Sequence, residues 1–282
     1  MAVTDIKTLA VARDVDMVNT FNQSITKLAQ MLSNCDPIKA NSGETLKQKH
    51  ITGKLSEEAY TEGEDIPVST YKWEDIKTFS VEIKPYRKRT TLQEVKKRGY
   101  EAAVDSTDAA MISDIQANIK KDFVGVLAAE NTAVTGENLV ATAATMWATL
   151  SNEVEDKGFG DVEAVFFVNP LDFATCIGKS EVFSAFGINY IEAWAGLGTL
   201  VATSKVEAGT LYATVKQNIK LYTATNEGDE AFGFYTDETG YIAVTHEATA
   251  KNLCYDTVAY VGISMFAEYT NFVIKGTIAP TA

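Results

Sequence analysis

Residues 41–70 form a polar stretch, NSGETLKQKHITGKLSEEAYTEGEDIPVST, with few large apolar side chains. Burial of apolar surface is the main favourable term in folding, so a stretch of this composition cannot build a core of its own. It predicts an extended arm and loop. The rest of the chain must supply the core, and 46% apolar residues in 282 suffice for one large domain or two joined ones.

The polar stretch overlaps a segment with strand-like alternation, residues 66–92. Phe79, Val81 and Ile83 fall on one side of it, and polar residues fall between them. We interpret this segment as one side of a long hairpin. Because an isolated two-stranded ribbon is marginal in water, a polar hairpin is expected to gain its stability against another chain.

Helical periodicity follows this segment. The spacing of apolar side chains predicts a long helix over residues 107–129, and the run DSTD at 105–108 offers oxygens that could cap its first turn. The stripe of this helix consists of Ile112, Ile115, Ile119, Phe123 and Val126. A shorter amphipathic helix, starting at Asp14 or Asp16, is predicted from the spacing of Val15, Val18, Ile25, Leu28 and Leu32.

A further helix is predicted over residues 139–154, and Gly158-Phe159-Gly160 ends it. The apolar run VEAVFFV, from Val162, predicts a buried strand. Asn169-Pro170 has the residue types of a helix start, with Asn as the cap and Pro in the first position. The apolar face of the helix over residues 139–154 is formed by Leu139, Ala143, Met146, Trp147 and Leu150.

The C-terminal part of the chain is rich in strand signals. Beyond Gly196, short apolar runs separated by turns predict the strands GTLVATS, TLYATV, NIKLYTA, AFGFY and GYIAVTH. The last block, CYDTVAYVGISMFAEYTNFVIKGTIAP, predicts long paired strands. The fold class is therefore α+β, with one long helix beside sheets.

The net charge of −13 argues against nucleic-acid binding, because phosphate contacts rely on Lys and Arg that displace counterions. Residues 55–75 carry seven acids and one base, whereas residues 76–98 carry eight bases and two acids. An acidic run of this kind is most often a solvated loop face, and we interpret the basic run as a protein–protein docking patch. The acidic candidates are Glu57, Glu58, Glu62, Glu64 and Asp65, and the basic candidates are Arg87, Lys88, Arg89, Lys96, Lys97 and Arg98.

The chain offers little for catalysis. It has two histidines, His50 and His246, and neither lies beside a nucleophile motif such as G-x-S-x-G. Cys35, Cys176 and Cys254 have no metal-ligand spacing and are interpreted as reduced thiols. No apolar stretch approaches the ~20 residues of a membrane-spanning helix. We therefore expect no catalytic residue, metal, cofactor or membrane.

The order of these elements resembles the major capsid proteins of tailed bacteriophages, which have the Hong Kong 97 (HK97) fold. An amphipathic arm, a polar hairpin, a long helix, a helix with a buried strand, short strands and a final strand block follow one another in the same order. The resemblance implies an N-terminal arm at 1–47, an extended loop (E-loop) at 48–92, a peripheral domain at 93–136 and 236–282 with a spine helix at about 107–129, and an axial domain at 137–235.

The resemblance also implies a function. The chain would be a virion capsid protein, synthesised in the cytoplasm of a bacterial host, that assembles with copies of itself into pentamers and hexamers of an icosahedral shell around double-stranded DNA. Other expected partners are a portal and a separate scaffolding protein, because only a short segment precedes the loop. In such capsid proteins the loop reaches over a neighbouring subunit, so the acidic candidates are expected to dock on the basic candidates of the next copy. Sequence-specific DNA contacts and membrane partners are not implied, and no cross-linking residue is carried over.

Two other interpretations stay open. One is an encapsulin-like compartment, a shell of the same fold that stores a cargo enzyme. The other is a hydrolase that works with paired carboxylates and acts as a small oligomer with a deep pocket. Particle formation distinguishes the shells from the enzyme, and the contents of the particles distinguish the two shells.

Overall fold

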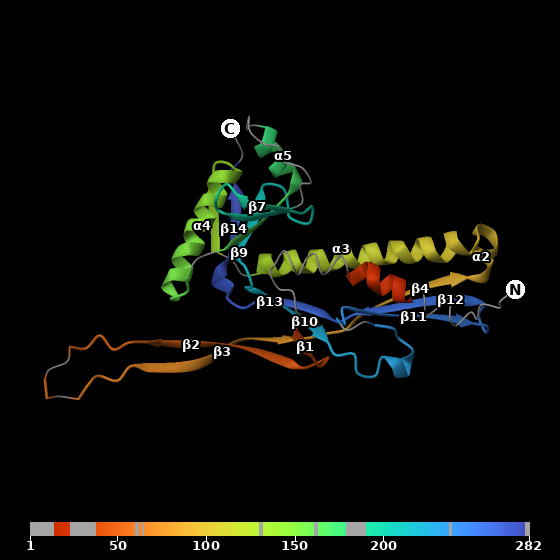
Figure 1. The fold of residues 1–282 in the computed structure, drawn as a ribbon, viewed down its shortest axis with the longest axis horizontal. Helices are drawn as coiled ribbons and strands as arrows, with labels where there is room; N and C mark the ends of the chain where they lie inside the picture. Colours follow the sequence, from red (N-terminus) through yellow and green to blue (C-terminus); the bar gives the residue numbers. More distant parts are fainter. Residues whose placement is uncertain are drawn as a thin grey trace.

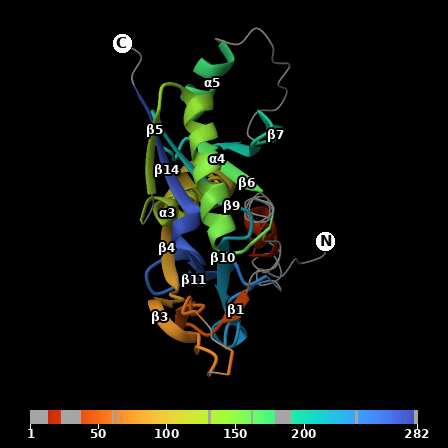
Figure 2. The ribbon, with the colours of Figure 1, turned by 90° about the vertical axis from the view of Figure 1, so that its left-hand side faces the viewer.

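The computed structural model describes residues 14–22, 38–59, 62–63, 65–129, 132–160, 163–178, 190–236 and 239–279. Figure 1 shows three parts: an elongated base built on a long helix, a compact unit standing on one end of the base, and a hairpin that projects beyond that end. Figure 2, turned by 90°, shows the compact unit above the base and the hairpin. Helices and sheets of these kinds confirm the predicted α+β class.

The hairpin consists of β2 (Thr45–Lys54) and β3 (Thr70–Ser80), which pair antiparallel as predicted. The segment 66–92 does not belong to it as a whole, however. β4 (Lys84–Thr91) turns into the base and pairs with β12 along its whole length. Val81, between the two strands, is fully buried, so the chain passes through a small core before β4 begins.

A short helix, α2 (Leu92–Arg98), lies at the end of the base farthest from the hairpin (Figure 1). The side chain of Thr91 caps it by accepting a hydrogen bond from the amide of Glu94. The helix ends at Gly99, whose φ of 86° is a left-handed value that favours glycine. The chain thereby reverses from β4 into the long helix.

The long helix is α3 (Ser106–Ala129), which confirms the helix predicted over 107–129. The DSTD run does not cap it, because a π-helical turn (Glu101–Asp105) leads into it and Ser106 already has helical backbone angles. Its buried stripe is the predicted one, except that the last position is Leu127 instead of Val126. The buried apolar residues are Ile112, Ile115, Ile119, Phe123 and Leu127.

A helix over residues 14–22 lies against α3. Its Met17, Val18 and Phe21 are buried in one core cluster with the first half of the α3 stripe. The predicted position Val18 is thus confirmed as part of a buried helical face. Three further residues of the predicted helix lie outside the described residues: Ile25, Leu28 and Leu32.

Two three-stranded sheets complete the base. One has the order β11-β12-β4 with antiparallel pairs, and the other has the order β1-β10-β13. The final strand block is therefore divided among several sheets. The new strands are β1 (Ile38–Ala40), β10 (Ile219–Ala224), β11 (Ile242–Thr249), β12 (Cys254–Val261) and β13 (Ile263–Ala267).

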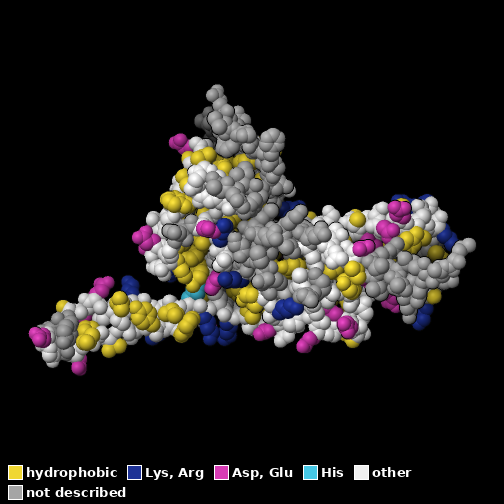
Figure 3. Space-filling model, in the orientation of Figure 1, with side chains coloured by type: hydrophobic (Ala, Val, Ile, Leu, Met, Phe, Trp, Pro, Cys, Tyr) yellow, Lys and Arg dark blue, Asp and Glu magenta, His cyan; other side chains and the backbone are white. Residues whose placement is uncertain are grey.

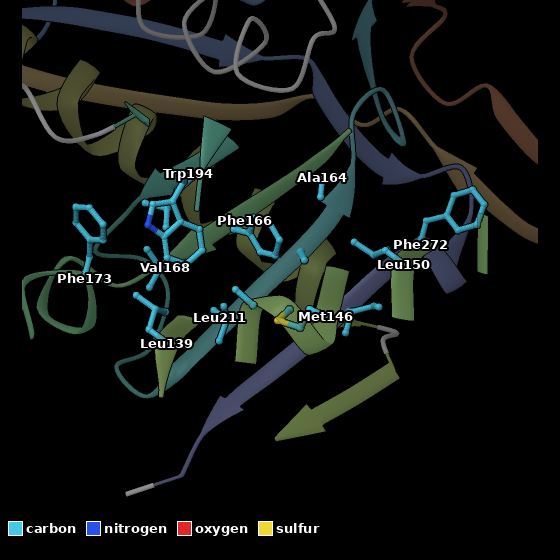
Figure 4. Packing of buried hydrophobic residues seen from close by; sticks show 14 of the residues in the cluster. Leu139, Met146, Leu150, Ala164, Phe166, Val168, Phe173, Trp194, Leu211 and Phe272 are labelled. Atoms are coloured by element: carbon cyan, nitrogen blue, oxygen red, sulfur yellow. The ribbon is translucent and has the colours of Figure 1, made fainter. Parts of the chain in front are cut away.

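The compact unit contains a six-stranded sheet of order β5-β14-β9-β6-β8-β7, with α4 packed on it. Every residue of β6 is buried, as the apolar run predicted. Figure 4 shows Met146 and Leu150 of α4 beside Phe166 and Leu211 of the sheet. The elements are β5 (Thr132–Gly136), α4 (Leu139–Asp156), β6 (Ala164–Val168), α5 (Pro170–Gly178), β7 (Tyr190–Trp194), β8 (Gly198–Ala202), β9 (Thr210–Val215) and β14 (Val273–Ile278).

Both helix starts predicted for this unit are confirmed. Asn138 caps α4 by accepting a hydrogen bond from the amide of Ala141 at 2.9 Å. Asn169 caps α5 in the same way, from the amide of Leu171 at 2.9 Å. On α4, Trp147 is 38% exposed, so it lies at the margin of the predicted apolar face and not within it.

The predicted strand AFGFY is wrong. Glu230–Phe232 forms a 3-10 turn that ends at Gly233, whose φ of 75° is left-handed. Tyr235 alone pairs, through an isolated bridge to Val244. Phe232 is 81% exposed, so its apolar character does not reflect a buried strand face.

Strand pairing crosses the domain ranges that the resemblance implied. β5 and β14 lie in the compact sheet, although their residues fall in the ranges expected for a peripheral domain. β10 falls in the expected axial range, yet it pairs in the base. The domain ranges themselves stay a prediction.

Candidate assembly surface

The root of the hairpin is anchored to the base through one face. Phe79 stacks on Phe266 with ring centroids 4.0 Å apart, and His50 stacks on Tyr269 at 4.7 Å. The buried side chain of Gln48 donates to backbone carbonyls at the end of β13. These contacts fix where the hairpin leaves the base.

Beyond the root, the hairpin exposes large apolar side chains, which Figure 3 shows along its length. Ile51 and Trp73 face each other across the strands, and Tyr71 lies on the same face because side chains alternate with a period of two. Trp73 is 69% exposed. Apolar side chains gathered on an exposed element are typical of contact sites. The hairpin apolar surface consists of Ile51, Leu55, Ile66, Val68, Tyr71 and Trp73.

The acidic candidates lie around the turn of the hairpin, at its free end. Glu57, Glu58, Glu62 and Asp65 are exposed, and within the described part of the chain none of the four forms an ion pair. Glu64 lies outside the described residues. This acidic tip therefore adds negative charge beside the apolar side chains nearest the turn.

The basic candidates of β4 do not form one surface. Arg89 donates from Nε to Oδ1 of Asp256 at 2.8 Å, and Arg87 bonds the same carboxylate. The hydrogen bond from Arg89 has the largest effect on the pKa of Asp256, and together with Arg87 it lowers that pKa to about 2. Lys88 points to the other face, where its Nζ lies 2.5 Å from Oδ1 of Asp108. Alternation divides a basic run in a strand between two faces, so Lys88 is engaged inside the subunit, and its role as a contact residue stays a prediction.

The other basic candidates lie on α2. Lys96, Lys97 and Arg98 occupy its last turn, where cations are favoured by the helix dipole, and all three are exposed. Arg98 also pairs with Glu94 one turn earlier. These residues present positive charge at the far end of the base.

Next to α2 lies an apolar groove of about 310 Å³, which we call the distal groove. It runs between α2 and the turn that joins β11 to β12, where Leu253 is 60% exposed. It therefore offers apolar surface beside positive charge. Its lining includes Leu92, Val95, Tyr100, Ala248, Leu253 and Tyr255.

The acidic tip and the distal groove cannot meet within one subunit. Figure 1 places the hairpin and α2 at opposite ends of the long axis of the molecule. The two surfaces have complementary charge and both expose apolar side chains. Any contact between them must therefore join two copies of the chain.

The described residues contain no group of three or more His, Cys, Asp or Glu side chains that could hold a metal ion. His50 stacks on Tyr269, and His246 is held between buried carboxylates. Cys176 and Cys254 are half-buried, and Cys35 lies outside the described residues. None of the described helices is long and apolar enough to cross a membrane.

Sequence reasoning found the acidic tip but missed the hairpin apolar surface. A signal was present, because Tyr71 and Trp73 alternate with polar residues. Ile51 lies opposite Trp73. The low average hydrophobicity of the segment hid this pattern. The distal groove had no comparable signal, because its residues come from α2 and from a turn far away in sequence.

No family model matches the chain, and no curated protein matches it. Solved capsid structures do match. The capsid of cyanophage P-SCSP1u gives a TM-score of 0.60 at 8% identity, covering 87% of this chain and 86% of that one. The mature capsid of bacteriophage PhiM1 gives a TM-score of 0.59 at 7% identity, covering 88% and 86%.

The virus-like particle from Pyrococcus furiosus is also similar, with a TM-score of 0.53 at 7% identity over 92% of this chain and 97% of that one. Identities this low show the fold alone. The chain therefore has the HK97-like fold of phage capsid proteins, as the order of its elements implied. The same fold is shared with a particle that is described as virus-like and not as a phage.

Proposed function

We propose that the chain is the major capsid protein of a tailed phage, and that it assembles with itself into the pentamers and hexamers of an icosahedral shell around double-stranded DNA. One observation carries the proposal: the fold of phage capsid proteins presents a long hairpin whose apolar side chains find no cover in the subunit. A second copy provides that cover. The role is structural and not catalytic.

The contact that we propose joins the hairpin of one copy to the distal end of another. Val68 and Ile66 would enter the distal groove, and the acidic tip would lie against Lys96, Lys97 and Arg98. Exposed ion pairs contribute only ~0.2 to 1 kcal/mol each, so the apolar contact supplies most of the affinity. The charges favour the correct neighbour, because like charges oppose other arrangements.

The proposal includes the expected partners and location. The protein would be made in the cytoplasm of a bacterial host and end in the virion, with a scaffolding protein and a portal as further partners. The overall charge of −13 would keep packaged DNA from adhering to the shell. DNA would be enclosed without sequence-specific contacts.

An encapsulin-like compartment is the second candidate, favoured by the similarity to the Pyrococcus furiosus particle. Both candidates predict closed shells, so the contents separate them. Electron microscopy of particles purified from an infected or expressing cell, with analysis of their nucleic acid and protein, tests both. Shells with double-stranded DNA and a portal support the capsid, a single packaged enzyme supports the compartment, and small oligomers alone contradict both.

A further inference from the structure

Three neighbouring strands of the base bring a lysine, a threonine and a histidine into one row. Lys88 of β4 is the register partner of Thr257 in β12, and Thr257 is the partner of His246 in β11. Side chains opposite one another in a sheet share a face, and here that face is turned to α3. Asp108 of α3 accepts a hydrogen bond from the Thr257 hydroxyl at 2.8 Å. The row therefore meets a carboxylate of the long helix.

His246 extends this contact to the N-terminal helix. Its Nε2 lies 3.2 Å from Oδ2 of Asp108, and its Nδ1 bonds the carboxylate of Asp14 in the helix over residues 14–22. The side chain of His246 is 1% exposed, and that of Asp14 is 6% exposed. One imidazole thus bridges two helices that also share apolar packing.

The groups around His246 come from every element packed against it. Asp14 and Asp16 lie on the N-terminal helix, and Asp105 and Asp108 lie on the turn and helix opposite. Lys88 approaches from β4, and the ring of Tyr255 stacks on the imidazole at 5.6 Å. The groups bonded to one another include the carboxylates of Asp14 and Asp108 and the ammonium of Lys88. Their charges balance only when the imidazole carries its proton.

The electrostatics favour the protonated state. Burial alone would lower the pKa of His246, but hydrogen bonds and charges from Asp108 and Asp14 outweigh it and raise the pKa to about 9. Burial also raises the pKa of Asp14. At Asp108 the bonds from His246, Lys88 and Thr257 outweigh burial and lower the pKa. Near neutral pH the cluster is therefore an ion network without excess charge.

Among the described residues, the apolar packing of the N-terminal helix leaves a space on the side where the cluster lies. A cavity of about 470 Å³ opens between this helix and α3, and His246 lies in its wall. Met17 and Thr20 line one side of the cavity, and Ala109 and Ile112 line the other. The ionic bridge therefore holds the helix on the side of this space, and Met17, Val18 and Phe21 hold it by apolar packing.

We propose that His246 is a protonation latch that holds the N-terminal helix on the long helix of the base, and that loss of its proton releases this helix. The latch is independent of the identity of the particle and of the hairpin contact. It makes the position of the N-terminal segment a function of pH.

The sign follows from the two states of the histidine. The folded pKa lies above the ordinary value of 6.5, so the stabilisation is complete below about pH 6.5 and is lost as pH rises through about 9. A neutral imidazole leaves buried carboxylates with one cation. The N-terminal helix is then expected to leave before the rest of the base unfolds, because the bond between His246 and Asp14 depends on the proton.

Hydrogen exchange of the unassembled full chain tests the latch. Protection factors correct for the effect of pH on intrinsic exchange, and α4 in the compact unit provides an internal reference. Between about pH 7.5 and about pH 10 we expect protection of residues 14–22 to fall by roughly tenfold or more, with α4 unchanged. Equal changes in the two segments, or none in residues 14–22, would overturn the proposal.

Two variants and a control assign the effect to His246. In His246→Gln, protection of residues 14–22 should already be lost at about pH 7.5 and no longer depend on pH, whereas His50→Gln should match the wild type. Asp14→Asn keeps the histidine but removes a charge, so the midpoint of release should move to lower pH. If Asp14→Asn leaves the midpoint in place, another group titrates and the latch is wrong, even if His246→Gln fails to fold.

Discussion

Apolar side chains are buried in one set of strands of this chain and exposed in another. All five residues of β6 are buried, and Phe166 is 0% exposed between α4 and the remainder of the sheet. In the hairpin, Ile51 and Trp73 lie opposite each other in register, yet they are 57% and 69% exposed. The first set completes a core within the subunit. The second set has no second layer.

The difference indicates two sources of stability. A sheet with helix cover is stable by itself, whereas a ribbon of two strands needs a further surface. In a single subunit, the acidic tip keeps the hairpin soluble, and the contacts at its root fix its direction. The compact unit therefore stabilises the fold of the subunit, and the hairpin is available for contacts with neighbouring copies.

The largest expected effect comes from shortening the hairpin. Lys54 and Thr70 face each other in register, so replacing residues 56–69 with one glycine leaves Leu55-Gly as a two-residue turn. We expect the subunit to keep its fold and unfolding free energy, and to form no closed particles. Circular dichroism and electron microscopy measure the two parts. Particles of normal number and size would show that the hairpin is dispensable.

Truncating one aromatic side chain in each region sharpens the comparison. Phe166→Ala should lower the unfolding free energy of the unassembled subunit by about 3–5 kcal/mol, because it leaves a cavity in a packed core. Trp73→Ala should change it by less than about 0.5 kcal/mol but should reduce assembly. Denaturant titration of both variants provides the values. A similar loss in both would mean that Trp73 belongs to the subunit core.

A smaller effect is expected from the charges. Reversing Glu57, Glu58 and Glu62 to Lys should weaken assembly at low salt and have less effect at high salt, because exposed pairs are screened. Reversing Lys96, Lys97 and Arg98 to Glu in the same chain should restore assembly in part. Light scattering at two salt concentrations measures both.

Arg87→Glu with Arg89→Glu is the control for the charge exchange. These residues bind Asp256 within the subunit, so their reversal should lower subunit stability and should not restore assembly of the acidic-tip variant. Restoration by this control and not by the α2 set would move the contact from the distal groove to the outer face of β4.

The smallest effect concerns acid stability. The pKa of Asp256 is held at about 2 by Arg89 and Arg87, below its ordinary value. The stabilisation is therefore present above about pH 4 and is lost as pH falls through about 2. Asp256→Asn should lower the unfolding free energy by about 1 kcal/mol or less near neutral pH, because both arginines are largely solvated. The difference from wild type should vanish below about pH 2 in acid titrations.

The elements that the sequence predicted are those whose signal is continuous and local. α3 and α4 each carry an unbroken helical period, β6 is a continuous apolar run, and Asn169 marks a helix start. The strand over 66–92 was predicted as one because alternation continues through Val81. Only the burial of that residue, against Ala40 and Ala224, divides the strand into β3 and β4.

The candidate contact surfaces were predictable only in part. Arg87, Lys88 and Arg89 are consecutive in sequence, but the pleat of a strand separates them, and partners distant in sequence, Asp256 and Asp108, bind them. The acidic tip was predictable because a turn keeps its charges together. The distal groove and the His246 cluster depend on strand register between distant segments, which composition does not reveal.

Hydroxyl-radical footprinting with mass spectrometry, on unassembled subunits and on particles of the same protein, tests most directly whether the hairpin is covered by another copy. Trp73 should react strongly in the subunit, where it is 69% exposed, and should be protected in the particle. Trp194, at 3% exposure, should stay protected in both states and Phe232, at 81%, reports general access in the subunit. Equal reactivity of Trp73 in subunits and particles would contradict the account.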